Sequence, residues 1–87
     1  MTLNFTNESR SYDATRRAVR FWGYDGSREV SFFVTEDALH RLQPDAGDGE
    51  PGLLSAFASH RDRVYAAAAR VYARGRKGSY EIRGGDL

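Results

Sequence analysis

The sequence predicts one α+β domain, residues 1–87, in which a small antiparallel sheet is packed by one short and one long helix. Three observations predict this class. Two β-rich segments flank an Asp-Gly pair, two amphipathic helical segments follow, and a last β-rich segment comes near the end of the chain. The expected element order is β-β-β-α-α-β. A length of 87 residues fits one domain, because domains rarely divide below about 150 residues.

The clearest local signal is a β-hairpin formed by residues 17–24 and 27–34. Asp25-Gly26 between them is typical of a type I′ turn, in which both central residues have positive φ. That turn would pair Trp22 with Glu29. One face of the hairpin is then apolar and is expected in the core: Val19, Phe21, Val30, Phe32 and Val34. The opposite face carries Arg20, Trp22, Tyr24, Glu29, Ser31 and Phe33.

Residues that are typical of helix starts and helix ends predict the two helices. Thr35 is expected to cap a short helix that ends before Pro44. Pro51 fits the first position of a long helix, and Gly75 fits its end. The apolar stripe of this helix is expected to pack on the hairpin, and it comprises Leu53, Leu54, Phe57, Val64, Ala68, Val71 and Tyr72. Strands are expected within residues 2–6 and 79–83, and loops over residues 7–15 and 44–50.

The composition excludes several classes of function. The chain has no cysteine, which excludes disulfides, thiolate nucleophiles and cysteine-ligated metals. No apolar run approaches 18 residues, and the first residues lack the pattern of a signal peptide, so we expect a cytoplasmic protein without membrane contact. Residues 47–52 spell G-x-G-x-x-G, but they follow a helix and contain two acids that repel phosphate. Neither His40 nor His60 has a second nitrogen ligand three or four residues further along, so a zinc site would need scattered carboxylates. The sequence also shows no nucleophile–base pair and no cofactor loop, so no catalytic, cofactor or metal site is expected.

Charge is distributed unevenly although the net charge is only +1. Residues 36–50 carry a net charge of −4, and residues 61–83 carry +5. A basic ridge is expected along the long helix and just beyond it, and it comprises Arg63, Arg70, Arg74, Arg76 and Lys77. The spacing suits a nucleic-acid backbone. A solvated helix face is the favoured interpretation, because no known nucleic-acid motif accompanies the ridge.

Arg61 falls inside the predicted apolar stripe, between Phe57 and Val64. A buried guanidinium needs an acid or several carbonyl groups as partners. We favour a structural role for Arg61. Its guanidinium either ties the helix to the hairpin or to residues 7–15, or reaches the solvent at the end of its buried aliphatic chain. The functional alternative is an anion-binding arginine. The candidate acids are Asp13, Glu29 and Asp37.

The second hairpin face is the candidate partner surface. If the helices cover only the first face, its aromatic residues are exposed, and exposed aromatic patches mark partner surfaces. Alternatively, other elements cover them. These residues are Trp22, Tyr24 and Phe33. The outer face of the long helix, where a second chain can pack closely, shows Ala66, Ala69 and Ala73. We predict a non-enzymatic protein-binding or self-associating module, such as a homodimer, with weak nucleic-acid binding through the ridge as the alternative.

Six short runs of residues, spread over nearly the whole chain, carry a family resemblance: Ser11–Asp13, Arg17–Phe21, Asp25–Gly26, Phe32–Leu39, His60–Arg63 and Gly75–Tyr80. They resemble the bacterial family called domain of unknown function 1488. The resemblance implies a small proteobacterial cytoplasmic protein of α+β fold. It implies no activity and no functional residues, so it adds no site to those above.

Overall fold

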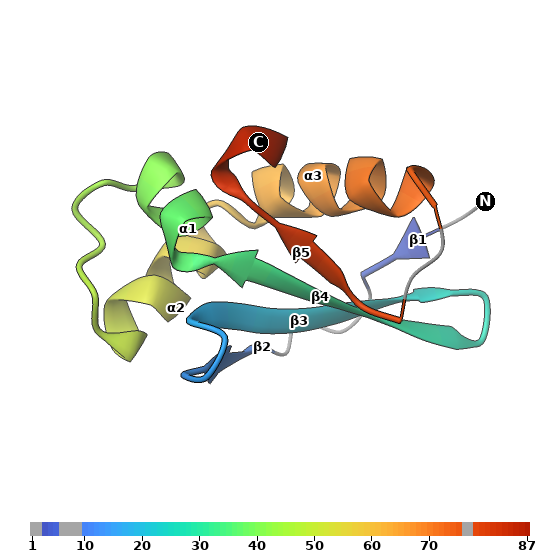
Figure 1. Ribbon diagram of the computed structural model, residues 1–87, viewed down its shortest axis with the longest axis horizontal. Helices are drawn as coiled ribbons and strands as arrows, with labels where there is room; N and C mark the ends of the chain where they lie inside the picture. Colours follow the sequence, from blue (N-terminus) through green and yellow to red (C-terminus); the bar gives the residue numbers. More distant parts are fainter. Residues whose placement is uncertain (1–2, 6–9, 76–77) are drawn as a thin grey trace.

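A computed structural model describes residues 3–5, 10–75 and 78–87 of the chain. The elements follow in the order β1 (Leu3–Asn4), β2 (Arg10–Asp13), β3 (Ala18–Asp25), β4 (Arg28–Thr35), α1 (Glu36–Leu42), α2 (Glu50–Ser59), α3 (Arg61–Ala73), β5 (Tyr80–Ile82) and the 3₁₀ helix η1 (Gly84–Asp86). The helices lie on one side of the sheet (Figure 1). The predicted α+β class is therefore confirmed.

The sheet is mixed, with the strand order β1-β3-β4-β5, and β2 also pairs with β3. β3 and β4 are antiparallel, whereas β5 runs parallel to β4. The prediction of a purely antiparallel sheet is wrong at β5, because the chain crosses three helices before it returns, and such a long crossover allows a parallel strand. The predicted loop over residues 7–15 is also wrong where β2 pairs with β3, and residues 7–9 lie outside the described residues.

The hairpin forms where the sequence predicts it, but with a different turn. Asp25 pairs with Arg28, and Trp22 pairs with Ser31 rather than with Glu29. The loop residues are therefore Gly26 and Ser27, and Gly26 has a φ of 64°. Glycine at the first loop position is the mark of a type II′ turn. The predicted register is wrong by two residues, but both hairpin faces are retained because side chains alternate with a period of two.

The long helix predicted from Pro51 to Gly75 is divided into two. α2 ends at Ser59, and His60 has φ −117° and ψ 26° before α3 begins. A straight helix over residues 50–73 would be about 36 Å long. That length slightly exceeds the longest extent of the whole molecule, 35 Å. The break lets both segments lie over the sheet.

The short helix α1 is confirmed, with Thr35 Oγ1 accepting a hydrogen bond of 3.2 Å from the backbone N–H of Ala38. None of the described helices is long and apolar enough to cross a membrane.

The core lies between the sheet and the helices. Phe21 stands at its centre, with its ring centroid 5.3 Å from that of Phe32 and 5.1 Å from that of Phe57. Tyr65 of α3 stacks on Phe5 at 4.1 Å. The predicted stripe is buried except for Leu54, which is partly buried, and Ala56 and Ala67 join it. The apolar hairpin face is buried as predicted.

Candidate interaction surfaces

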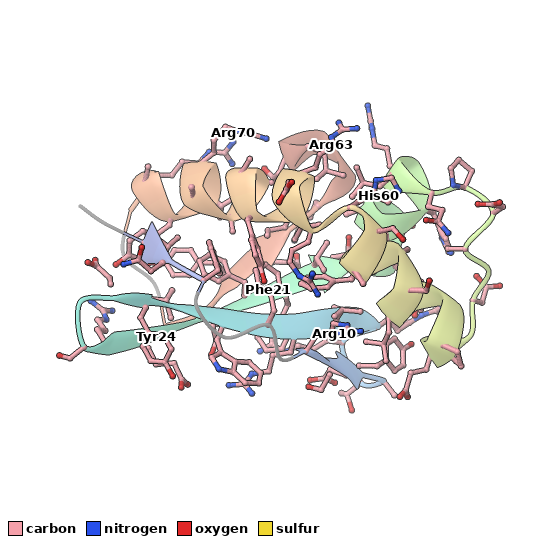
Figure 2. All side chains as sticks on the ribbon, turned by 180° about the vertical axis from the view of Figure 1, so that it is seen from behind. Arg10, Phe21, Tyr24, His60, Arg63 and Arg70 are labelled. Carbon is pink, nitrogen blue, oxygen red and sulfur yellow. The ribbon has the colours of Figure 1, made fainter. Side chains whose placement is uncertain are left out.

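The helices leave one face of the sheet uncovered. Phe21 points into the space between α3 and the sheet, whereas Tyr24 lies on the far side (Figure 2). The strand pairing places alternate residues of β3, β4 and β5 on this uncovered side. We call it the open sheet face, and it comprises Arg20, Trp22, Tyr24, Glu29, Ser31, Phe33 and Glu81.

Arginine side chains cover two of the three predicted aromatic residues. The guanidinium of Arg16 lies 4.0 Å from the ring centroid of Phe33, which is 7% exposed. The guanidinium of Arg20 lies 4.8 Å from the ring of Trp22. Trp22 and Tyr24 are half-buried. Of the two alternatives, cover by another element holds for Phe33, because an arginine from the β2–β3 connection stacks on it.

Charges of both signs alternate across the open sheet face. Arg20 lies 3.9 Å from Glu29 and donates a hydrogen bond of 3.2 Å to Ser31 Oγ. On β5, Glu81 pairs at 2.6 Å with Arg83, the next residue after the strand. The face therefore has aromatic rings framed by paired charges rather than a field of one sign.

The basic ridge runs along the outer side of α3. Arg63 and Arg70 project away from the sheet (Figure 2). Arg63, Arg70 and Arg74 are all exposed, as predicted. Arg76 and Lys77 lie outside the described residues.

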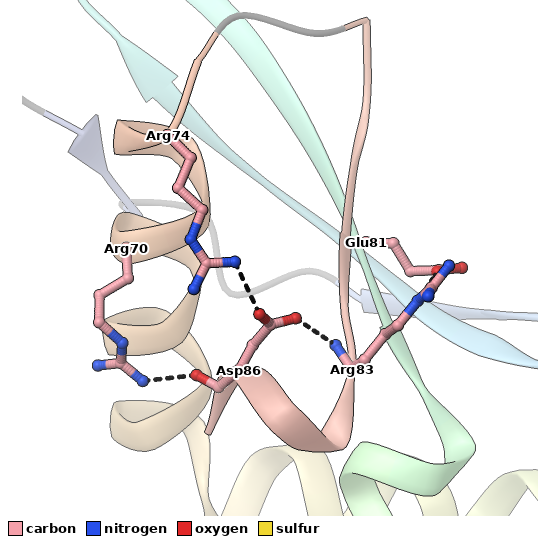
Figure 3. A network of polar contacts seen from close by, with 5 residues as sticks. All are labelled: Arg70, Arg74, Glu81, Arg83 and Asp86. Atoms are coloured by element: carbon pink, nitrogen blue, oxygen red, sulfur yellow. Dashed lines mark hydrogen bonds and ion pairs between the residues drawn. The ribbon is translucent and has the colours of Figure 1, made fainter.

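Asp86 lies against the C-terminal half of this ridge (Figure 3). Its carboxylate accepts hydrogen bonds from Arg74 at 2.9 Å and from the backbone N–H of Arg83 at 2.8 Å. Its backbone carbonyl accepts one from Arg70 at 2.7 Å. The bond from the Arg83 N–H and the Arg74 guanidinium lower the pKa of the Asp86 carboxyl from its ordinary value, against the effect of burial. Asp86 therefore stays charged at neutral pH. No local sequence pattern indicates its place on the ridge.

Arg61 is half-buried at the start of α3, with its guanidinium 5.9 Å from the ring centroid of Phe57. It lines a surface depression of about 530 Å³ formed by residues 58–63 at the α2–α3 junction. Of the predicted acidic partners, Asp13 accepts a bond from the backbone of Arg16, and Glu29 faces Arg20. The role of Arg61 as a structural arginine stays a prediction.

A polar cluster that local sequence patterns do not indicate lies where β4 meets α1. Glu36, only 8% exposed, accepts hydrogen bonds from Tyr12 Oη at 2.5 Å and from Arg17 at 3.2 Å. Arg17 has a φ of 51°, which is unusual for a residue with a side chain. The sequence gives no sign of this cluster, because Tyr12 lies on β2, within residues that are predicted as loop. The cluster ties β2 and the β2–β3 connection to α1.

The Glu36 carboxyl is expected to make the fold sensitive to acid. The bond from Tyr12 Oη, followed by that from Arg17, lowers its pKa below the ordinary value of 4.5, although burial opposes this. A lowered pKa in the folded state stabilises the protein above the unfolded pKa, and the benefit is lost as pH falls through the folded pKa. Glu36→Gln is therefore expected to lower the free energy of unfolding at pH 7, with a difference from wild type that shrinks below pH 4.5.

Urea titrations between pH 7 and pH 3 measure this. Asp37→Asn is the matched control, because it removes one charge from the exposed neighbouring position. A pH-independent difference between wild type and Glu36→Gln would contradict the assignment.

The two histidines lie in different settings. His40 Nε2 is 2.7 Å from the carbonyl oxygen of Gly47 and 3.6 Å from Asp48, and His60 stands at the α2–α3 break. Within the described part of the chain, no group of three or more His, Asp or Glu side chains is placed to hold a metal ion.

The comparisons with known proteins agree with this fold. The family model described as a protein of unknown function, DUF1488, matches residues 3–83. A crystal structure of a DUF1488-family protein of unknown function from Shewanella loihica superposes with a TM-score of 0.81 and 18% sequence identity, over 93% of this chain and 92% of that chain. No curated protein matches the chain. The match over residues 3–83 confirms the predicted resemblance, and the chain belongs to the domain of unknown function 1488 family.

Proposed function

We propose that the chain is a non-enzymatic binding module that associates with a second copy of itself through the open sheet face. The observation that carries the proposal is the pairing of half-buried aromatic rings with charges of both signs on the one sheet face that no described helix covers. Half-buried Trp22 and Tyr24 offer apolar area at low entropic cost, because each ring has few rotatable bonds.

The charges favour a second copy over a polyanion. Glu29 and Glu81 face the same side as Arg20, so a nucleic-acid backbone would meet repulsion there. A two-fold interface brings each patch against itself, and a patch with both signs can then match its own cations with its partner's acids. The open sheet face therefore suits a homodimer.

The size of the face predicts a weak dimer. The open sheet face is drawn from β3 and β4, with eight residues each, and from β5, with three. At about 3.3 Å per residue and about 4.8 Å between strands, this face covers roughly 300 Å². A standard stable interface buries about 800 Å² on each partner. We expect association that depends on concentration in the micromolar to millimolar range.

Sedimentation equilibrium from about 10 µM to 1 mM tests the proposal. The average mass of wild type should rise above the 9.8 kDa of the monomer as concentration increases. Trp22→Glu should remain monomeric, because it places a buried charge at the centre of the interface. Circular dichroism shows whether this variant is folded, and Tyr24→Ser provides a milder second variant on the same face.

Ala66→Glu is the matched control, since it adds the same charge on the exposed outer side of α3. It should associate like wild type. A wild type that stays monomeric at 1 mM, or dimers that Ala66→Glu breaks and Trp22→Glu leaves intact, would refute the assignment to the sheet. The second outcome would place the contact at the alanines of α3.

A further inference from the structure

Asp86 meets the basic ridge as a bound anion would. A carboxylate oxygen faces Arg74, a carbonyl oxygen faces Arg70, and a backbone N–H completes the contact. Guanidinium groups and backbone N–H groups are also the usual donors to phosphate oxygens in nucleic acid complexes. The side chain of Asp86 is 17% exposed and that of Arg74 is 64% exposed, so an incoming anion can reach Arg74 but must compete with the Asp86 carboxylate for it.

We propose that Arg63, Arg70 and Arg74 form a binding surface for the phosphate backbone of a single-stranded nucleic acid, and that Asp86 competes for the last two of them in the free protein. This goes beyond the proposed self-association, because the ridge lies on the outer side of α3, away from the open sheet face. Asp86 is an intramolecular competitor for any phosphate that approaches Arg74.

The spacing of the three arginines supports a polymer rather than a lone ion. They lie at helix positions separated by seven and four residues, which places them within about 40° of one another around α3. The separations along the axis are about 10.5 Å and 6 Å. This single row of about 16 Å can follow one strand, whereas a free phosphate ion reaches only one or two of the groups.

Competition from Asp86 explains why the charge of the basic ridge is only a weak indication of nucleic-acid binding. Asp86 adds one negative charge at the C-terminal half of the row, and its lowered pKa keeps that charge present at neutral pH. Each phosphate contact to a single strand contributes about −0.7 to the slope of log affinity against log salt. Removal of the Asp86 charge should therefore steepen the slope by about 0.7.

The test measures the binding of a labelled oligothymidylate of about 12 nucleotides by fluorescence anisotropy between ~20 and ~200 mM salt. Asp86→Asn keeps an oxygen that can accept the Arg83 N–H and removes the charge. We expect it to bind about tenfold more tightly than wild type at ~20 mM salt, with a slope steeper by about 0.7. Addition of Arg74→Gln to Asp86→Asn should reverse both effects.

Asp45→Asn is the control for net charge, because Asp45 is exposed on the loop before α2. It should bind like wild type. Equal slopes for wild type and Asp86→Asn, an equal gain in Asp45→Asn, or no binding by either protein would overturn the proposal. Amide shifts on the oligonucleotide titration should fall on residues 63–74, and shifts centred on Trp22 and Tyr24 would instead assign the contact to base stacking on the open sheet face.

Discussion

Replacement of Phe21 with alanine is expected to lower the free energy of unfolding by about 3–5 kcal/mol. Phe21 is 1% exposed, and its ring contacts aromatic rings from four other parts of the fold. The partners are Phe5 beyond β1, Phe32 of β4, Phe57 of α2 and Tyr65 of α3, with centroids 5.1–5.8 Å away. The truncation removes the one ring that all four share, and a domain of this size has a total stability of only about 4–13 kcal/mol.

Urea unfolding followed by circular dichroism at low micromolar concentration measures this loss. Tyr24→Ala is the matched control, since Tyr24 lies on the same strand and faces the other way. Its cost is expected to be about 1 kcal/mol, because the half-buried ring leaves no internal cavity. Equal losses in the two variants would show that the faces of β3 are assigned wrongly.

Replacement of Gly52 with alanine is expected to destabilise the protein by about 1–2 kcal/mol, although local helix propensity predicts the opposite sign. Within a helix, alanine is favoured over glycine by about 0.5–1 kcal/mol. A Cβ at position 52 would, however, stand 2.0 Å from the carbonyl oxygen of Ala46 in the preceding loop. That atom belongs to backbone, so the loop itself must move, and such overpacking costs about 1–3 kcal/mol.

Gly49→Ala is the control on the same segment. A Cβ there would meet only Pro51 Cδ, at the ordinary distance of 3.7 Å, and the φ of −79° suits any residue. The midpoint of urea unfolding should fall for Gly52→Ala and stay within about 0.5 kcal/mol of wild type for Gly49→Ala. A gain in stability for Gly52→Ala would mean that the loop does not approach α2 so closely.

The elements that local chemistry defines were predictable. Thr35 is followed by two acids and does cap α1. Alternation of apolar and polar residues assigned both faces of the hairpin correctly, even though the turn was placed one residue early. The turn was wrong because Asp25-Gly26-Ser27 fits two loops of equal length, and glycine is suited to both.

For the candidate surfaces, the sequence predicted which residues share a face but not which other side chains cover them. Alternation placed Trp22, Tyr24 and Phe33 together, but no local pattern indicates that Arg16 stacks on Phe33. Helical spacing aligned Arg63, Arg70 and Arg74, but Asp86 reaches the last two from 12 and 16 residues away. Such contacts depend on how the chain folds back to bring distant residues together. The spacing of residues in the sequence carries no information about that folding.

The sequence by itself determined the α+β class, the two faces of the hairpin and the family, because these follow from residue periodicity, turn chemistry and local runs. Only the tertiary structure decided the break at His60, the parallel return of β5, the Tyr12–Glu36–Arg17 cluster and the position of Asp86 on the ridge. Each of these depends on packing between segments distant in sequence. The length of the sheet limits how long a helix packed on it can be. Side chains from distant segments form hydrogen bonds only once those segments have packed together.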